Sequence, residues 1–176
     1  MGVYWTLQNE EAWEVFKGQG YLEGNPEYAG YLIKEYQWMI SQMKKRLPNY
    51  HGEFPIWLWP KKPDMRSTGH FDSQTRCVRI TIELDDEDVL ISDFMEWHIV
   101  LSDGFNANNE QEYDDYYAGK LSITKEESWE RIFDLHIPQN PEWSGTRDWL
   151  QGVTGRIYLS NIKKVEHFIS RKQGKY

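Results

Sequence analysis

Residues 55–102 read PIWLWPKKPDMRSTGHFDSQTRCVRITIELDDEDVLISDFMEWHIVLS, and this stretch decides the fold of the chain. Its centre, VRITIEL at residues 78–84, alternates apolar and polar side chains with the period of two that a half-buried β-strand requires. A shorter strand is expected at residues 56–59, and Ser92 or Asp93 is expected to begin a short helix. The stretch therefore predicts two strands followed by a helix.

The same stretch carries an unusual set of side chains around its long strand. They are Trp57, Trp59, Arg66, His70, Trp97 and His98. Indole N–H and guanidinium groups are costly to bury without partners, so this dense set predicts a lined cleft rather than ordinary core packing. Lys61, Lys62 and Arg66 have no helix end to explain them and are the expected residues for holding an anion.

Two helices are expected before this stretch. Residues 3–7 (VYWTL) predict a short strand, after which Asn9 can cap a helix that ends in a glycine turn. Apolar residues then recur at three- and four-residue spacing between two prolines, which predicts an amphipathic helix over residues 27–47. We expect this longer helix to pack against the sheet.

The remainder of the chain adds one helix and two strands. Thr124 and Glu127 form a capping box that opens a helix, whereas residues 110–115 (EQEYDD) have little apolar period and predict a solvated loop. Strands are expected near residues 153–159 and 165–170. This order lacks the regular alternation of a parallel sheet, so we expect an α+β fold. It would be one domain over residues 1–176, with a mixed or antiparallel split sheet and flanking helices.

Composition narrows the classes of function. The formal net charge of −8 argues against general phosphate-backbone binding, so nucleic-acid contact is expected only through a local basic patch. Cys77 is the only cysteine, which excludes an intrachain disulfide, and the five histidines show no metal-ligand spacing, so no metal is expected. No window approaches the roughly 20 apolar residues that span a bilayer. We therefore expect a cytoplasmic protein without membrane contact.

Seven stretches carry a family resemblance: WTLQNEEAWEVFKGQGYL, YQWMISQMKKR, PIWLW, KPDMR, VLISDFMEWHIVL, ESWERIF and VEHF. Together they resemble an uncharacterised bacterial family, the domain of unknown function 3841, over nearly the whole chain. The resemblance implies membership of that family but no activity.

The opening YWTLQNEEAWEVFKGQGYL, residues 4–22, is also similar to the first strand, helix and glycine turn of the ADP-ribosyltransferase-like fold. This resemblance implies an NAD-binding cleft, with Thr6 and Gln8 on the first strand and Gln151 on a late strand facing the reacting ribose. Thr6 and Gln8 stand where that fold usually has His or Arg, and Val153 stands where it has a late Glu. The resemblance therefore implies binding of NAD more directly than transfer.

Cleavage of the bond between nicotinamide and ribose develops positive charge on the sugar, which a nearby carboxylate stabilises, while aromatic rings stack and cations hold the diphosphate. The candidate catalytic residues are His98, Gln151 and Glu130. The candidate ligand-binding residues are Thr6, Gln8, Trp57, Trp59, Arg66, His70 and Trp97.

Three functions remain open from the sequence. The first is an enzyme or former enzyme acting on NAD or a related nucleotide. The second is a non-catalytic module that holds a nucleotide or modified base between Trp57, Trp59 and Arg66. The third is a protein-interaction or inhibitor protein that uses residues 110–117 as its contact surface. A pocket that joins Gln8, Arg66 and His98 would favour the first.

Overall fold

The computed structural model describes residues 1–136, 140, 142–143 and 148–172. Its strands are β1 (Gly2–Asn9), β2 (Tyr21–Leu22), β3 (Ile56–Leu58), β4 (Arg76–Leu84), β5 (Leu90–Asp93), β6 (Leu150–Thr154), β7 (Ile157–Tyr158) and β8 (Ile162–Ile169). Its α-helices are α1 (Glu10–Gln19), α2 (Ile33–Arg46), α3 (Phe94–Leu101), α4 (Glu110–Tyr117) and α5 (Lys125–Trp129). Short 3-10 helices are η1 (Pro26–Leu32), η2 (Asp86–Asp88), η3 (Glu130–Phe133) and η4 (Leu159–Asn161).

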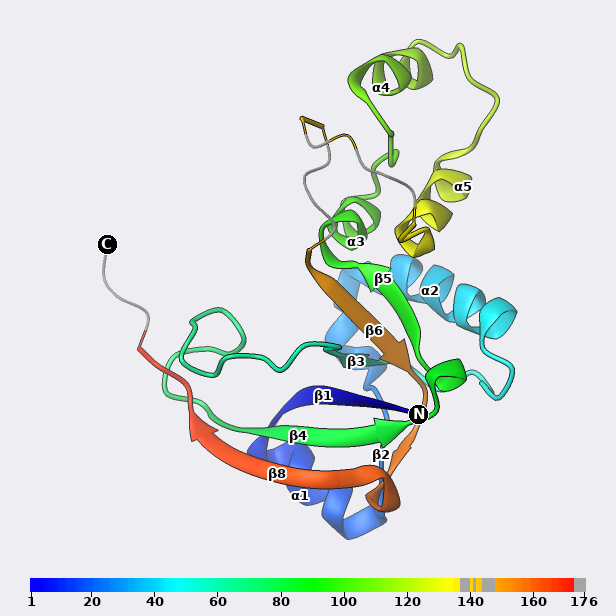
Figure 1. The fold of residues 1–176 in the computed structure, drawn as a ribbon. Helices are drawn as coiled ribbons and strands as arrows, with labels where there is room; N and C mark the ends of the chain where they lie inside the picture. Colours follow the sequence, from blue (N-terminus) through cyan, green and yellow to red (C-terminus); the bar gives the residue numbers. More distant parts are fainter. Residues whose placement is uncertain (137–139, 141, 144–147, 173–176) are drawn as a thin grey trace.

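The strands form three sheets, in the orders β1-β4-β8, β3-β6-β5 and β2-β7. Every pairing of strands in the described part of the chain is antiparallel. Figure 1 shows β1, β4 and β8 in one layer and β5 and β6 rising from it toward α3. The predicted α+β class, with an antiparallel split sheet and flanking helices, is confirmed.

Strand β4 is central because β1 and β8 pair with its two edges. Val78, Ile80 and Ile82 are fully buried, as the alternation predicts. The prediction of a half-buried strand is wrong at Arg79, which is also buried. Arg79 lies opposite Glu166 of β8, and its Nη2 is 2.9 Å from that carboxylate. An ion pair across the strands thus allows a charged side chain on the face that was expected to be solvated.

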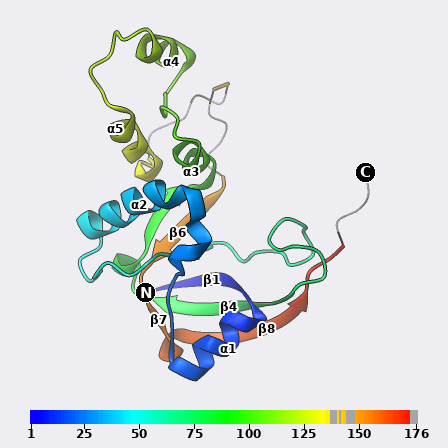
Figure 2. The ribbon, with the colours of Figure 1, turned by 180° about the vertical axis from the view of Figure 1, so that it is seen from behind.

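Helix α1 packs on the β1-β4-β8 sheet. It begins where Asn9 Oδ1 accepts a hydrogen bond from the backbone N–H of Ala12 at 2.7 Å, and it ends at Gly20, whose φ of 86° suits glycine. Trp13 and Phe16 are buried in the core of this sheet, with their rings edge to face. Figure 2, seen from behind, shows α1 lying along the sheet.

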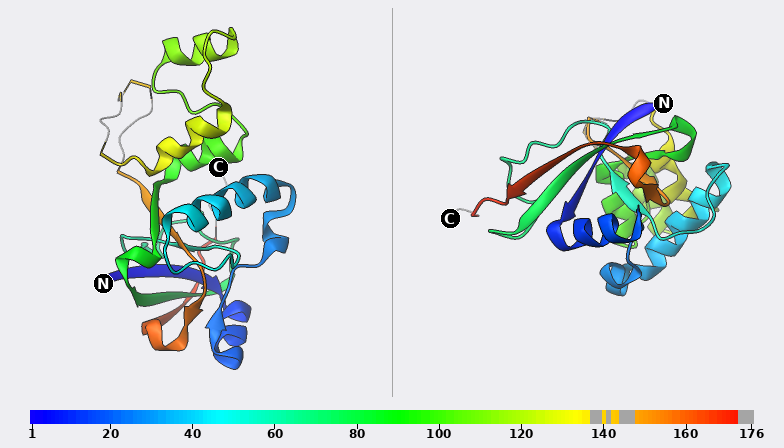
Figure 3. Two further views of the ribbon diagram at one scale, coloured as in Figure 1. Left: turned by 90° about the vertical axis from the view of Figure 1, so that its right-hand side faces the viewer. Right: turned by 90° about the horizontal axis from the view of Figure 1, so that it is seen from below.

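The second core lies between α2, α3, α5 and strand β6. Met39 and Met43 of α2 are fully buried there, together with Val153 of β6. The predicted helix over residues 27–47 is divided in the structure, because Gly30 has a φ of 53° inside η1 and α2 begins only at Ile33. Figure 3 shows α2 crossing beside β5 and β6.

The predicted loop at residues 110–115 is wrong, because these residues form α4. Asn109 Oδ1 accepts from the backbone N–H of Glu112 at 2.8 Å, and Gln111 donates to Asp115 one turn later at 3.1 Å. A cap and a pair four residues apart thus stabilise this short helix, and Tyr116 stacks on Phe105 at 3.9 Å. Figure 1 places α4 at the far end of the molecule from α1.

The predicted helix starts at Asp93 and Thr124 are confirmed. Asp93 Oδ1 accepts from the backbone N–H of Glu96 at 2.8 Å, and Thr124 and Glu127 form the capping box. Residues before Asp93 form β5, a strand that the sequence did not predict. Across the described residues, every helix is too short or too polar to cross a membrane.

The second core gives a test of packing. Met43→Ala removes a fully buried side chain, whereas Met95→Ala removes one that is 53% exposed on α3. We expect Met43→Ala to lower the free energy of unfolding by about 2–5 kcal/mol, because it leaves a cavity that the core cannot close. Met95→Ala should change it by less than about 0.5 kcal/mol. Urea denaturation measures both, and equal effects would contradict this core.

Candidate functional site

Trp5 and Trp59 join the two larger sheets. The backbone N–H of Trp5 donates to the carbonyl of Trp59 at 3.0 Å, and the N–H of Trp59 donates back to Trp5 at 2.8 Å. Trp59 follows β3 directly, so this pair links β3 to β1. Trp59 also lines two cavities, which we name the Gln8 groove and the lysine pocket.

The Gln8 groove has a volume of about 440 Å³ and lies between β1, α1, η1 and β3. Three predicted ligand-binding residues line it: Gln8, Trp57 and Trp59. Other lining residues include Asn9, Glu11, Glu23, Asn25, Tyr28, Tyr36 and Phe54. Among the residues that the structure describes, the two glutamates are the only charged ones in the lining, so the groove is aromatic and acidic.

A chain of hydrogen bonds fixes the amide of Gln8. Thr6 is fully buried, and its hydroxyl donates to the carbonyl of Trp57 at 3.0 Å. The same hydroxyl oxygen accepts from the Gln8 side-chain amide at 3.0 Å. Thr6 therefore positions Gln8 from behind the groove and does not line it.

Trp97 has a similar supporting position behind Trp57. It is 3% exposed, and its ring lies 5.3 Å from that of Trp57 and 5.7 Å from that of Tyr36. Trp57 Nε1 donates to the Tyr36 hydroxyl at 3.1 Å, which satisfies the indole N–H, and burial raises the pKa of Tyr36. Tyr36 and Trp57 therefore line one side of the groove, and Trp97 packs behind them.

The lysine pocket has a volume of about 300 Å³ and mainly apolar walls. Its lining residues are Trp59, Pro60, Lys61, Lys62, Pro63, Asp64, His70, Asp148, Trp149 and Leu150. The ring of His70 is 6.0 Å from that of Trp59, and Trp149, 51% exposed, stacks on Phe94 at 4.3 Å. Aromatic faces and two lysines thus meet in one cavity.

Both lysines and carboxylates line the lysine pocket, because Lys61 and Lys62 lie there with Asp64 and Asp148, and further cations gather around the neighbouring Glu166. Glu166 has three cations within 4 Å, namely Arg79 at 2.9 Å, Lys164 at 3.0 Å and Lys62 at 3.8 Å. Hydrogen bonds from Lys164 and Arg79 lower the pKa of Glu166. Lys61 forms no ion pair with any residue that the structure describes. The two lysines therefore keep positive charge that an anion can use.

The Arg66 side chain pairs with Asp64 and does not line either cavity. Its Nη2 is 2.8 Å from one oxygen of Asp64, and its Nε is 3.0 Å from the other, which makes a fork. The hydrogen bonds from Arg66 lower the pKa of Asp64, and the pair raises the pKa of Arg66. The Arg66 side chain is 78% exposed and lines neither cavity.

The three candidate catalytic residues lie apart from one another. His98 is exposed on α3, where its Nδ1 is 2.8 Å from the carbonyl oxygen of Phe94. Gln151 is buried on β6, and its amide lies 3.5 Å from the hydroxyl of Ser92. Glu130 lies at the surface with Lys45 at 3.1 Å. Neither cavity joins Gln8, Arg66 and His98. Gln8 lines the Gln8 groove, whereas Arg66 and His98 line neither the groove nor the lysine pocket.

The family model described as Domain of unknown function (DUF3841) matches residues 3–125. The chain belongs to the DUF3841 family. That range contains the whole Gln8 groove, but Asp148, Trp149 and Leu150 of the lysine pocket lie beyond it. No curated protein and no solved structure matches the chain. The resemblance of its opening to the ADP-ribosyltransferase-like fold therefore stays a prediction.

Two features of this DUF3841 member's cavities were missed in the sequence. Trp149 lines the lysine pocket, although it is far from Trp59 in the sequence. The one signal in the sequence was that Trp149 lies two residues before the candidate catalytic residue Gln151. Glu11 lines the groove from the first turn of α1, where an acidic residue is usually explained by the helix dipole. Among the described residues, no group of three His, Cys, Asp or Glu side chains could hold a metal.

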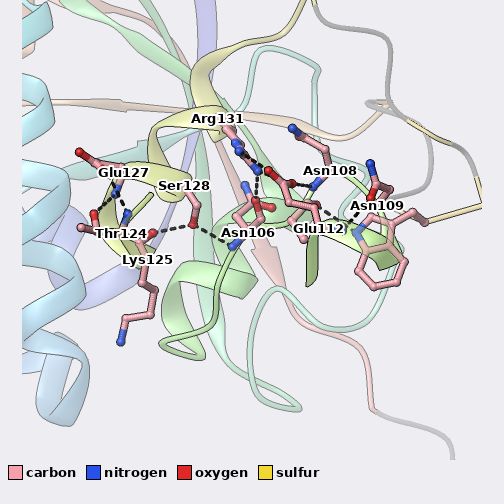
Figure 4. Close-up of polar contacts among 11 residues, drawn as sticks. Asn106, Asn108, Asn109, Glu112, Thr124, Lys125, Glu127, Ser128 and Arg131 are labelled. Carbon is pink, nitrogen blue, oxygen red and sulfur yellow. Dashed lines mark hydrogen bonds and ion pairs between the residues drawn. The ribbon is translucent and has the colours of Figure 1, made fainter. Parts of the chain in front are cut away.

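A separate polar cluster fixes α4 to the rest of this DUF3841 protein (Figure 4). The two Nη atoms of Arg131 donate to the two carboxylate oxygens of Glu112, each at 2.8 Å, and Nη1 also donates to the carbonyl of Asn106 at 2.7 Å. Ser128 accepts from the backbone N–H of Asn106 at 2.9 Å. The cluster connects η3 and α5 to the start of α4, so residues 110–117 are presented in a fixed position.

This cluster predicts a pH-dependent stability. The hydrogen bonds from Arg131 lower the pKa of Glu112 in the folded protein. A carboxylate with a lowered folded pKa stabilises the fold above its ordinary pKa of about 4.3, and that contribution is lost as the pH falls through the folded value. We expect Glu112→Gln to lower the free energy of unfolding by about 1–2 kcal/mol at neutral pH, and by much less in acid.

Glu110→Gln is the matched control, because Glu110 is an exposed residue in the same first turn of α4. Urea denaturation at about pH 7 and about pH 3 measures both variants against wild type. A loss for Glu112→Gln that is the same at both pH values, or that equals the loss for Glu110→Gln, would contradict the role of this ion pair.

Proposed function

We propose that this protein binds a nucleotide-like ligand in the lysine pocket. The observation that carries the proposal is the meeting of Trp59, His70 and Trp149 with Lys61 and Lys62 in one cavity. A base or nicotinamide ring can stack on an aromatic side chain, which contributes about 1–3 kcal/mol per base. The lysine ammonium groups supply the positive charge that a phosphate needs.

The local charges favour this pocket over the groove. The Gln8 groove contains more of the predicted ligand-binding residues, but its charged lining residues are Glu11 and Glu23, which repel a diphosphate. The lysine pocket is lined by two lysines and two aspartates, of which Asp64 pairs with Arg66, and it lies beside Glu166, whose single carboxylate faces three cations. Its volume of about 300 Å³ is at the lower end of ligand sites, so one half of a dinucleotide such as NAD would occupy it.

The function that we propose is binding, not transfer of ADP-ribose. Transfer requires a carboxylate near the ribose, and Val153 stands in this chain where the ADP-ribosyltransferase-like fold has its late Glu. Of the two aspartates that line this pocket, Asp64 is engaged by Arg66 at 2.8 Å. Glu130 is in ion pairs with Lys45 and Arg46 on another surface. The resemblance of the opening strand and helix to the ADP-ribosyltransferase-like fold supports NAD and ADP-ribose as the first ligands to test.

Calorimetry with ADP-ribose, NAD and nicotinamide tests the proposal. We expect ADP-ribose and NAD to bind and nicotinamide alone to bind more weakly, because it lacks phosphate. The double variant Lys61→Gln, Lys62→Gln should lower the affinity for ADP-ribose about tenfold, and added salt should lower it further in the wild type. Lys44→Gln, an exposed lysine of α2 that lines neither cavity, should leave the affinity unchanged.

Two results would overturn the proposal. One is the failure of all three ligands to bind at millimolar concentration, in which case residues 110–117 become the better-supported contact surface, for a protein. The other is an equal loss of affinity in the Lys44→Gln variant and the double variant, which would show general attraction of anions instead of a site.

A further inference from the structure

The Gln8 groove differs from the lysine pocket in the charged residues that line it. Glu11 and Glu23 are its charged lining residues, and no Lys or Arg in the described part of the chain lines it. Arg156 Nη2 is 2.7 Å from Glu23 and offsets that charge. Glu11 forms no ion pair with a described residue, so its negative charge is open to a ligand. The groove therefore carries a net negative charge next to aromatic walls.

The amide of Gln8 has a fixed orientation that adds to this polarity. The Thr6 hydroxyl has one hydrogen, which it donates to the carbonyl of Trp57, so its oxygen can only accept from Gln8. Gln8 must therefore turn its NH₂ group toward Thr6. Its carbonyl oxygen remains as an acceptor for a ligand. Both Gln8 and Glu11 thus call for a ligand that donates hydrogen bonds.

The aromatic walls of the groove favour the same kind of ligand. The rings of Tyr36 and Phe54 are stacked at 5.2 Å, and the ring of Trp57 meets Tyr36 edge to face at 6.2 Å. Aromatic faces attract a cation within about 6 Å, most strongly when water is excluded. They also supply apolar area for the body of a ligand. A phosphate would meet the carboxylates of Glu11 and Glu23 in this groove and no lysine or arginine among the described residues.

We propose that the Gln8 groove binds an organic cation that joins an N–H-donating charged group to a flat apolar body. The charged group lies against Glu11 and the carbonyl oxygen of Gln8, and the body packs on Tyr36, Phe54 and Trp57. This site is separate from the lysine pocket, and Trp59 is the one lining residue that the two share. The proposal therefore does not rest on nucleotide binding.

Benzamidinium and benzamide are suitable probes, because they have nearly the same shape and differ in charge. Calorimetry should show that benzamidinium binds about tenfold or more tightly than benzamide, because only benzamidinium carries a positive charge. The measurement is made at low ionic strength, because salt screens the attraction between charges. Equal affinities, or no binding of either probe at millimolar concentration, would overturn the proposal.

Two variants of α1 locate the charge. Glu11→Gln keeps the size of the side chain but removes its charge, and we expect it to weaken benzamidinium binding about three- to fivefold. Glu14→Gln is the control, because Glu14 lies on the same helix, pairs with Lys17 at 2.7 Å and does not line the groove. An equal effect of both variants would overturn the assignment to Glu11.

The double variant Lys61→Gln, Lys62→Gln separates this proposal from the nucleotide site. The double variant should leave the affinity for benzamidinium unchanged. Glu11→Gln should not lower the affinity for ADP-ribose. Loss of benzamidinium binding in the lysine variant would place the probe in the other cavity and overturn the proposal. Each site thus has its own probe and its own variant.

Discussion

The pairing of Trp5 with Trp59 is the contact on which the architecture depends. Its two backbone hydrogen bonds connect the sheet that packs on α1 to the sheet that packs on α2. Side chains strengthen the connection, because Ile56 and Leu58 of β3 are buried in the core of the β1-β4-β8 sheet, whereas Val153 of β6 is buried in the second core. The same pairing holds the Trp59 side chain between the Gln8 groove and the lysine pocket. This backbone contact therefore joins the two sheets at the residue that lies between the two cavities.

Local charge in this protein differs from its net charge. The chain carries a formal charge of −8, yet the surroundings of Glu166 hold more cations than carboxylates. Exposed charges act over about 10 Å at moderate salt, so a ligand in either cavity responds mainly to nearby side chains. The net charge of the chain could not show that lysines gather at one of two neighbouring cavities and glutamates at the other.

The sequence predicted helices and strands better than it predicted which of them pack against or pair with each other. The alternation around Ile80, the caps at Asn9, Asp93 and Thr124, and the α+β class followed from local patterns. The burial of Arg79 did not, because it requires Glu166 to lie opposite on β8. The candidate site was predicted in part: Gln8, Trp57 and Trp59 meet in one cavity, whereas Trp149 reaches the other through pairing between distant strands.

The position of β4 between β1 and β8 has a consequence for how the chain is made. Strand β8 begins about 80 residues after β4 ends, so at about 5–20 residues per second a ribosome needs roughly 4–16 s to supply it. Until then β4 exposes one bare edge of apolar residues, the kind of edge that pairs with other chains. Nascent protein is therefore most vulnerable to aggregation late in translation, when the first half of the sheet awaits its last strand.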